Sequence, residues 1–326
     1  FPVNPTRPIT AWGLIGAGIR AYDHMDGVGN RYGVHTVILE VDGEEVFRSV
    51  VDRFAYEENR YINSWTHGQY MKSFIEPGNR LRMLHASNGN RGLVEINEER
   101  PYRFVYTLSD ALGNTSKVRF TVQGKNTEIH PVEHREKYAF KWDRTNYLQE
   151  PGLELVVPRG MLYDDVWLDY SVRADSGDVA FTYQLHNKRV PLHGACEMRI
   201  GLRRDRLEDK SKYYVAGVTA RGGKYSIGGT YEDGFMKVRI RDLGTYTVAV
   251  DTVPPEIIPF NPGQWGRTGR ITLKAKDKET GINSYRGTID GKYALFGKPN
   301  SISGNLVFEP DTKHVKKGGR HTVEMT

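Results

Sequence analysis

Two short runs of the chain, separated by a turn, alternate between apolar and polar residues. Their apolar members are Phe104, Tyr106, Leu108, Val118, Phe120 and Val122. A period of two places every second side chain on one face of an extended strand, so each run predicts a strand with one buried face. Between the runs, Asp110, Gly113 and Asn114 tolerate the backbone conformations of a tight turn. Residues 106–122 therefore predict a β-hairpin that closes a sandwich-type domain.

The length and composition of the chain favour several small domains over one large one. The chain has 326 residues, and at about 150 residues per ordinary domain two or three domains are expected. A hydrophobic content of 38% is low for a single large core and suits small sandwiches. Strands punctuated by Asp, Gly and Asn turns recur along the chain. The sequence therefore predicts an all-β fold of tandem, Ig-like β-sandwich domains.

Charge, cysteine usage and hydropathy narrow the class of protein. The formal charge of +6 comes from scattered Lys and Arg, which indicates a solvated basic surface and no nucleic-acid partner. The single cysteine, Cys196, excludes an internal disulfide. No apolar run approaches the ~18 residues of a membrane span. The chain begins at Phe1 without an initiator Met or a signal peptide, so we expect a fragment or a processed product.

Residues Ile9–Ile15 are predicted to form a first strand, and the glycine motif that follows, Gly16-Ala-Gly18-Ile-Arg-Ala21, has the form of a dinucleotide-binding turn. That function requires a helix that begins at the glycines and holds the pyrophosphate at its N-terminus. Residues 19–33 are a poor helix, because glycines interrupt them and no apolar stripe repeats at helical spacing. The chain then turns at Asp42-Gly43, where a doubly wound fold would place a helix. These features favour a strand-rich domain over a nucleotide site.

The segment from residue 54 to residue 91 differs from its surroundings and is predicted to be an insertion, with a short helix in its first half. It concentrates large rings and arginines, which suit stacking on sugars or contact with a partner. These candidate contact residues are Tyr56, Arg60, Tyr61, Trp65, Tyr70, Arg80 and Arg82. The alternative is that the insertion covers a sheet edge and buries its rings, as large aromatic side chains usually are.

Two polar, proline-containing stretches, Gly124–Lys137 and Thr252–Pro262, are predicted linkers. They divide the chain into domains at residues 1–127, 128–251 and 252–326. Strands of the second domain are predicted at Leu153–Val157, Val166–Val172, Val179–Leu185, Met198–Leu202, Tyr213–Val218 and Thr245–Val250. Two further segments, Asp175–Asp178 and Asp233-Gly234, are interpreted as turns, because neither carries the ligand series of a calcium loop.

No catalytic or metal-binding motif is evident. His130 and His134 have a spacing that suits zinc on a helix, but Pro131 disfavours a helix and no third ligand is present. Cys196 lies three residues from His193, yet a lone thiol in a strand-rich segment is more often a small buried hydrophobe. The chain also lacks a G-x-S-x-G elbow and a phosphate-binding P-loop. We therefore predict no catalytic residue and no metal ligand.

The third domain repeats the order of the first. Residues 271–296 give a strand, an Asp-containing loop, a strand, an Asp-Gly turn and another strand, as do residues 18–47. Residues 320–326 then match residues 102–107. This internal repeat indicates tandem sandwiches of one type. Because no further turn and strand follow residue 326, we expect the third domain to be truncated.

Several runs resemble a known family over essentially the whole chain. They are GIRAYDHMDGVGNRYGVHTVILEVDGEEVFRSVVDRFAYEENRYINS, SDALGNTS, YTVAVDTVPPEIIP and SYRGTIDGKYALF. These runs are similar to the region that follows the catalytic domain in secreted LytM/lysostaphin-type zinc metallopeptidases of Bacteroidetes. In that family, zinc is held upstream by a His-x-x-x-Asp pair and a His-x-His pair. Neither spacing occurs among the ten histidines here, so no zinc ligand is carried over to this chain.

The resemblance implies a secreted protein of the periplasm or outer cell envelope. We expect the chain to be a non-enzymatic accessory, binding or spacer region of a peptidoglycan metalloendopeptidase. Its partners would then be the upstream catalytic domain and peptidoglycan or another envelope component, and zinc would belong to the catalytic domain alone. The alternative is a stand-alone extracellular adhesin or carbohydrate-binding β-sandwich protein.

Overall fold

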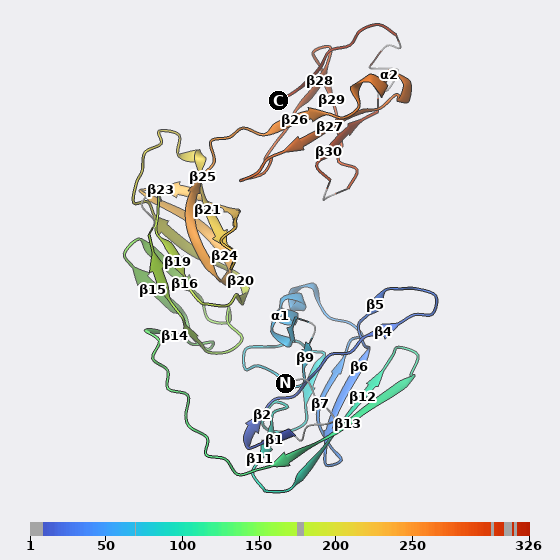
Figure 1. The fold of residues 1–326 in the computed structure, drawn as a ribbon, viewed down its shortest axis with the longest axis vertical. Coiled ribbons are helices and arrows are strands. Elements are labelled where there is room, and N and C mark those ends of the chain that lie inside the picture. The colour runs from blue at the N-terminus through green and yellow to red at the C-terminus, as the bar shows by residue number, and fades with distance from the viewer. Residues whose placement is uncertain (1–8, 69, 175–178, 301–302, 310–314, 316–317) are drawn as a thin grey trace.

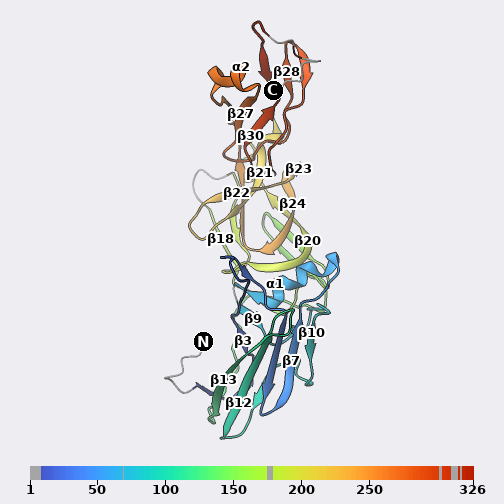
Figure 2. The same cartoon turned by 90° about the vertical axis from the view of Figure 1, so that its right-hand side faces the viewer.

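The computed structural model describes residues 9–68, 70–174, 179–300, 303–309, 315 and 318–326. Strands dominate, and the few described helices are short. None of those helices has the length and apolar character needed to cross a membrane. Figure 1 and Figure 2 show three strand-rich bodies that follow one another along the longest axis of the molecule, with the second body displaced to the left in Figure 1. Each body has its own hydrophobic core. The all-β class predicted from the sequence is confirmed.

The first body, residues 9–124, is built on a six-stranded sheet with the order β1-β13-β12-β6-β7-β10. Its strands are β1 (Ile9–Ala11), β6 (Thr36–Val41), β7 (Glu44–Val50), β10 (Leu84–Ala86), β12 (Pro101–Ser109) and β13 (Thr115–Gly124). β12 and β13 pair antiparallel along the whole length of β12. The hairpin predicted around residues 106–122 is therefore confirmed.

Smaller sheets complete the first body. They consist of β2 (Gly13–Ile15) with β11 (Val94–Ile96), β3 (Gly18–Ile19) with β9 (Tyr70–Lys72) and β8 (Thr66–His67), and β4 (Asp23–His24) with β5 (Arg31–Tyr32). The core lies under β12, where Phe104 and Tyr106 are almost fully buried. The ring of Phe104 stacks on that of Phe120 at 5.1 Å, and the buried Tyr106 hydroxyl lies 2.8 Å from the Ser73 hydroxyl. The alternation in the two runs thus places their rings on the same buried face.

The structure corrects one detail near the N-terminal end and agrees with the sequence on another. The single strand expected at residues 9–15 is two strands, because Gly13 has a φ of +77° and redirects the chain from one sheet to another. Gly18 of the glycine motif lies in a strand rather than at a helix start. A Cβ at Gly16 would lie 2.5 Å from the Phe74 ring, and one at Gly18 would lie 3.1 Å from the Met71 carbonyl oxygen. Close packing therefore explains the glycines.

The second body, residues 138–250, is a sandwich of two five-stranded sheets. One sheet consists of β15 (Asn146–Glu150), β16 (Leu153–Val157), β20 (Val190–Gly201), β24 (Phe235–Leu243) and β23 (Thr230–Glu232). The other consists of β18 (Ser171–Arg173), β19 (Thr182–Gln184), β25 (Thr245–Val250), β21 (Tyr213–Val218) and β22 (Lys224–Gly228). A two-stranded sheet of β14 (Tyr138–Phe140) and β17 (Val166–Leu168) and a short helix, η2 (Lys210–Lys212), complete it.

Most predicted strands of the second body lie where the sequence places them. The segment predicted at residues 166–172 divides into β17 and β18. Strands β14, β15, β22, β23 and β24 were not predicted from the sequence. The turn at Asp233-Gly234 is confirmed, with φ values of 46° and 83°. The other predicted turn, at residues 175–178, lies outside the described residues.

The third body, residues 256–326, has two three-stranded sheets. They are β26 (Glu256–Pro259), β27 (Ile271–Lys276) and β30 (Asn305–Phe308), and β29 (Lys292–Ala294), β28 (Gly287–Ile289) and β31 (Val323–Met325). Two short helices, η3 (Pro262–Gln264) and α2 (Trp265–Thr268), follow β26. The stretch 252–262 is therefore not a linker throughout, because β26 within it pairs with β27. The first predicted linker has neither helix nor strand from residue 125 to residue 137.

An Asp-Gly turn with the same conformation and the same hydrogen bond recurs in the first and third bodies. Asp42 and Asp290 both have positive φ values, 54° and 50°. The Asp42 carboxylate accepts a hydrogen bond of 2.8 Å from the amide of Arg103 on β12. In the third body the Asp290 carboxylate accepts one of 2.9 Å from the amide of Thr322, next to β31. The same side chain therefore connects the hairpin to the following strand in both bodies.

Replacing Asp42 with Ala is expected to destabilise the first body by about 1–3 kcal/mol, because a strand amide loses its acceptor and Ala disfavours a positive φ. Asp42→Asn keeps an acceptor oxygen and tolerates the left-handed conformation, so it should cost less. Hydrogen exchange of the β6 and β12 amides measures the loss of stability at Asp42, and exchange of the β23 and β24 amides measures it at the control position. Asp233→Ala is the matched control, since Asp233 has the same conformation without a side-chain hydrogen bond among the described residues. Equal losses at both positions would contradict the role of the carboxylate.

Candidate functional site

The insertion predicted from the sequence contains a short helical segment, as expected, formed by η1 (Tyr56–Tyr61) and α1 (Ile62–Trp65). Its rings have different environments. Trp65 is 6% exposed and its indole nitrogen donates a 3.0 Å hydrogen bond to the Lys72 carbonyl, so it is a core residue. Tyr56 is 88% exposed and Tyr70 46% exposed. Among the candidate contact rings, Tyr56 and Tyr70 are thus the ones that are exposed to solvent.

The arginines of the insertion also differ. Arg82 donates two hydrogen bonds, of 2.7 and 3.0 Å, to the carboxylate of Glu58. These bonds lower the pKa of Glu58 to about 2. The same carboxylate accepts a bond from the amide of Ala55 and so caps η1. Arg82 is therefore occupied within the insertion, whereas Arg80 is exposed.

Tyr61 and Arg60 lie at a junction between the first and second bodies. The Tyr61 ring packs on the ring of His193 at 4.2 Å. The hydroxyl of Tyr163 donates a 2.6 Å hydrogen bond to the Arg60 carbonyl, and the amide of Gly78 donates one of 2.7 Å to the Tyr163 carbonyl. Figure 1 shows α1 facing the second body. Part of the insertion therefore docks one body on the next.

Gly78 is required by this close approach. A Cβ there would lie 2.5 Å from the Leu162 carbonyl oxygen and 2.8 Å from the Tyr163 Cα. Both are backbone atoms, which do not move aside as a flexible side chain does. His193 completes the contact in a partly buried setting, where burial and the nearby Arg60 lower its pKa. The junction thus favours a neutral imidazole.

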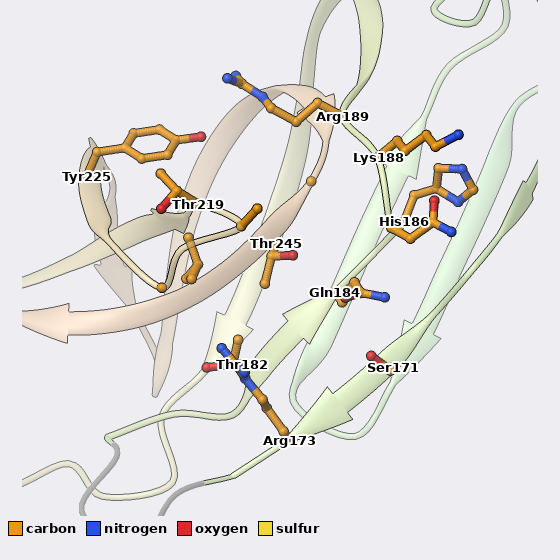
Figure 3. A pocket seen from close by; sticks show the side chains of 15 residues that line it. Ser171, Arg173, Thr182, Gln184, His186, Lys188, Arg189, Thr219, Tyr225 and Thr245 are labelled. Carbon is orange, nitrogen blue, oxygen red and sulfur yellow. The ribbon is translucent and has the colours of Figure 1, made fainter.

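A second site is a depression of about 730 Å³ on the outer face of the sheet that contains β18, β19, β25 and β21. Figure 3 shows its labelled side chains. The registers place Ser171, Gln184 and Thr245 side by side on neighbouring strands, and Arg173 beside Thr182. The alternate residues, Tyr183 and Tyr246, point into the core and are at most 1% exposed. The period of two therefore gives this sheet one apolar and one polar face.

Two loops and one aromatic ring form the walls of the pocket. Residues 186–189 lie on one side, and residues 218–220, Gly222 and Tyr225 contribute on the other. Tyr225 is paired with Gly217 across β21 and β22. A Cβ at Gly217 would lie 2.3 Å from the Tyr225 ring, so the absence of a side chain lets the ring lie over the strand.

The charged side chains that line the pocket are all basic. It contains Arg173, Lys188 and Arg189 together with His186, and no Asp or Glu side chain is among its lining residues. Arg189 forms a 2.6 Å ion pair with Asp242. Arg173 and Lys188 form no ion pair with the described residues. The pocket therefore presents two cations, Arg173 and Lys188, that no described carboxylate neutralises, beside several hydroxyl groups.

His186 is held as a neutral donor. Its Nδ1 accepts a 3.0 Å hydrogen bond from the amide of Asp169, which leaves the proton on Nε2. Burial is the main cause that lowers the pKa of His186. The Gln184 amide nitrogen donates to the Asp169 carbonyl at 3.0 Å, which leaves its oxygen as an acceptor for the pocket. Together with the threonines, these groups give the pocket both donors and acceptors.

The described residues contain no group of three or more His, Cys, Asp or Glu side chains placed to hold a metal ion. His134, one of the spaced histidines in the linker, stacks on Trp167 at 3.6 Å with nearly parallel rings. Cys196 is 1% exposed, and burial raises the pKa of its thiol to about 11. Its neighbours in the core of the second body are apolar, as expected around a small buried hydrophobe.

Comparison with known proteins gives one family match. Residues 137–251 match the family described as Zu5-like domain, which covers 115 of the 326 residues (251 − 137 + 1) and coincides with the second body. No curated protein matches the sequence.

Two solved structures are aligned with the chain at low similarity. One is from work on the host cell surface retention of a 1.5-MDa bacterial ice-binding adhesin, at 8% identity and a TM-score of 0.13, covering 86% of this chain and 76% of that one. The other is a Ca²⁺-stabilized adhesin of an Antarctic bacterium, at 10% identity and a TM-score of 0.16, covering 97% and 94%. At these TM-scores, neither alignment supports a structural argument.

Replacing Trp65 and Tyr56 separately with Ala should distinguish a core ring of the insertion from a surface ring by the loss of stability. Trp65→Ala should cost about 3–5 kcal/mol of stability in the first body, as expected for a buried aromatic side chain. Tyr56→Ala should change stability by less than about 0.5 kcal/mol. Thermal unfolding followed by far-ultraviolet circular dichroism measures both. A large loss with Tyr56→Ala would show that this ring is structural.

The junction between the first and second bodies should loosen in acid. Because docking lowers the pKa of His193, opening takes up a proton, so docking is strongest above the ordinary value of 6.5 and weakens as the pH falls below it. Hydrogen exchange of the Gly78 amide, corrected for intrinsic rates from about pH 8 to about pH 5, measures the opening. His193→Gln cannot titrate and should remove the pH response. An unchanged response in that variant would reject the role of His193.

Proposed function

We propose that the chain is a non-catalytic extracellular binding protein, of the adhesin or carbohydrate-binding type, whose second body binds an anionic saccharide. One observation carries the proposal: among the described residues, the lining of the outer-face pocket combines cations that have no ion-pair partner with hydroxyl and amide groups and contains no carboxylate. A volume of about 730 Å³ accommodates a short saccharide.

The residues of the pocket have complementary roles in this proposal. Arg173 and Lys188 attract and pair with a carboxylate or phosphate on the sugar. Ser171, Gln184 and Thr245 exchange hydrogen bonds with sugar hydroxyl groups from a rigid strand platform. The exposed part of the Tyr225 ring offers an apolar face for stacking on a sugar ring. The ligand is bound, not transformed, because no paired acid and base or activated nucleophile lies in the lining.

A role as the accessory region of a peptidoglycan metalloendopeptidase is the second candidate. It follows from the family resemblance of the sequence, and peptidoglycan itself carries carboxylates and sugar hydroxyls. The two candidates therefore differ in the ligand that the pocket prefers. Binding to soluble peptidoglycan fragments, but not to other acidic glycans, would favour the accessory role. Envelope or extracellular localisation is part of both proposals.

Binding of acidic glycans and of peptidoglycan fragments to the full chain tests the pocket. Arg173→Ala and Lys188→Ala should each weaken binding by at least about tenfold, and added salt should reduce the affinity of the unmodified chain. Arg241→Ala is the matched control, because Arg241 is exposed on β24 of the opposite sheet. Neutral analogues of the same sugars should bind more weakly. Equal losses with Arg173→Ala and Arg241→Ala, or no binding to any glycan, would refute the proposal.

A further inference from the structure

Trp167 is a large aromatic residue of the second body that lies outside its hydrophobic core. It lies opposite Ala139 in the antiparallel pair of β17 and β14, so both side chains are on the same face of this two-stranded sheet. Its neighbours in the strand, Val166 and Leu168, belong to the packing of the core, whereas Trp167 is not among the described residues of that packing. The indole ring is therefore on the outer face of the sheet, beside a small and exposed alanine.

The imidazole of His134, in the linker between the first and second bodies, covers this ring. The two ring centroids are 3.6 Å apart, and the ring planes differ by 7°. The Nδ1 atom of His134 lies 3.4 Å from the carboxylate of Glu136, which belongs to the same linker. Residues 125–137 are all exposed and form neither helix nor strand. The side chain that covers Trp167 is therefore carried by a segment that can move away without the loss of regular structure.

Polar groups lie close to the indole ring. The Nζ atom of Lys141 is 4.7 Å from the ring centroid and donates a 2.8 Å hydrogen bond to the carboxylate of Asp165. Both side chains are partly exposed. A flat aromatic face with donors and an acceptor beside it suits a pyranose ring, whose C–H groups stack on the indole while its hydroxyl groups form hydrogen bonds. Because Lys141 and Asp165 neutralise each other, the arrangement favours a neutral sugar over a charged one.

We propose that Trp167 is a stacking platform for a neutral, β-linked oligosaccharide, and that His134 occupies this platform until the ligand displaces it. β-Linked pyranoses with equatorial hydroxyl groups have flat C–H faces, which match the nearly parallel stack that the imidazole forms. The linker thus carries a competitor for the site. The platform shares no residue with the basic pocket of the second body, and its ligand needs no anionic group. The inference therefore stands independently of the proposed acidic saccharide.

Titration of chitotetraose and of cellotetraose into the full chain, followed by isothermal titration calorimetry, tests the platform. Trp167→Ala should weaken binding by at least about tenfold, and Trp167→Phe, which keeps a ring, should weaken it less. His134→Ala should strengthen binding by about two- to tenfold, because it removes the competing ring. His130→Ala is the matched control and should leave the affinity unchanged, since His130 belongs to the same linker and its side chain is 81% exposed.

Nuclear magnetic resonance follows the displacement directly. In the free chain the ring current of the indole should shift the His134 ring protons upfield, and saturating oligosaccharide should move them toward the position of the exposed His130. Added salt should not reduce the affinity, in contrast to an acidic glycan bound by the basic pocket. A salt-dependent affinity would place the ligand in that pocket and overturn the proposal. No binding of either oligosaccharide, or a His134→Ala affinity equal to or below that of the unmodified chain, would overturn it as well.

Discussion

A hydrogen bond from a strand amide to an Asp carboxylate fixes strand register in both repeated bodies. It connects Asp42 to Arg103 in the first body and Asp290 to Thr322 in the third. A shift of one residue in an antiparallel pair would turn every inward side chain toward solvent. The carboxylate therefore determines that Phe104 and Val323 face their respective cores. It also determines which backbone groups of each strand are left for a neighbour on the far edge.

Sequence reasoning was strongest where burial on one face imposes a period of two. The hairpin of β12 and β13 follows from such a pattern, and β16, β21 and β25 have the predicted bounds. It failed where a local residue overrode the pattern. Gly13 divides one expected strand into two. Pro259 suggested a linker, but β26 is an edge strand, where a missing backbone donor is tolerated.

The candidate sites were harder to predict, because their residues meet only in the fold. The pocket combines β18, β19 and β25 with loops that lie far apart in sequence, and nothing in a short polar strand such as Ser171–Arg173 identifies its neighbours. The insertion was recognised as unusual, but its composition alone did not show which of its rings are buried and which are exposed. Trp65 is buried by β9, and Tyr61 finds its partner, His193, in another body. The cluster of rings thus indicated that the insertion makes contacts, but not whether each ring contacts the core, a neighbouring body or a separate partner.

The junctions between the bodies use none of the residues that line the proposed saccharide pocket. The first junction rests on Tyr61, Tyr163 and His193, and the second on Asp251, whose carboxylate accepts hydrogen bonds of 2.6 and 3.2 Å from Thr280. The hydroxyl of Tyr214 also donates to Glu279 across the second junction. The proposed saccharide pocket lies on a sheet face of the second body and shares no lining residue with an apolar groove of the third body. A ligand in that pocket would therefore need no surface of the neighbouring bodies, because every residue that lines it comes from the second body.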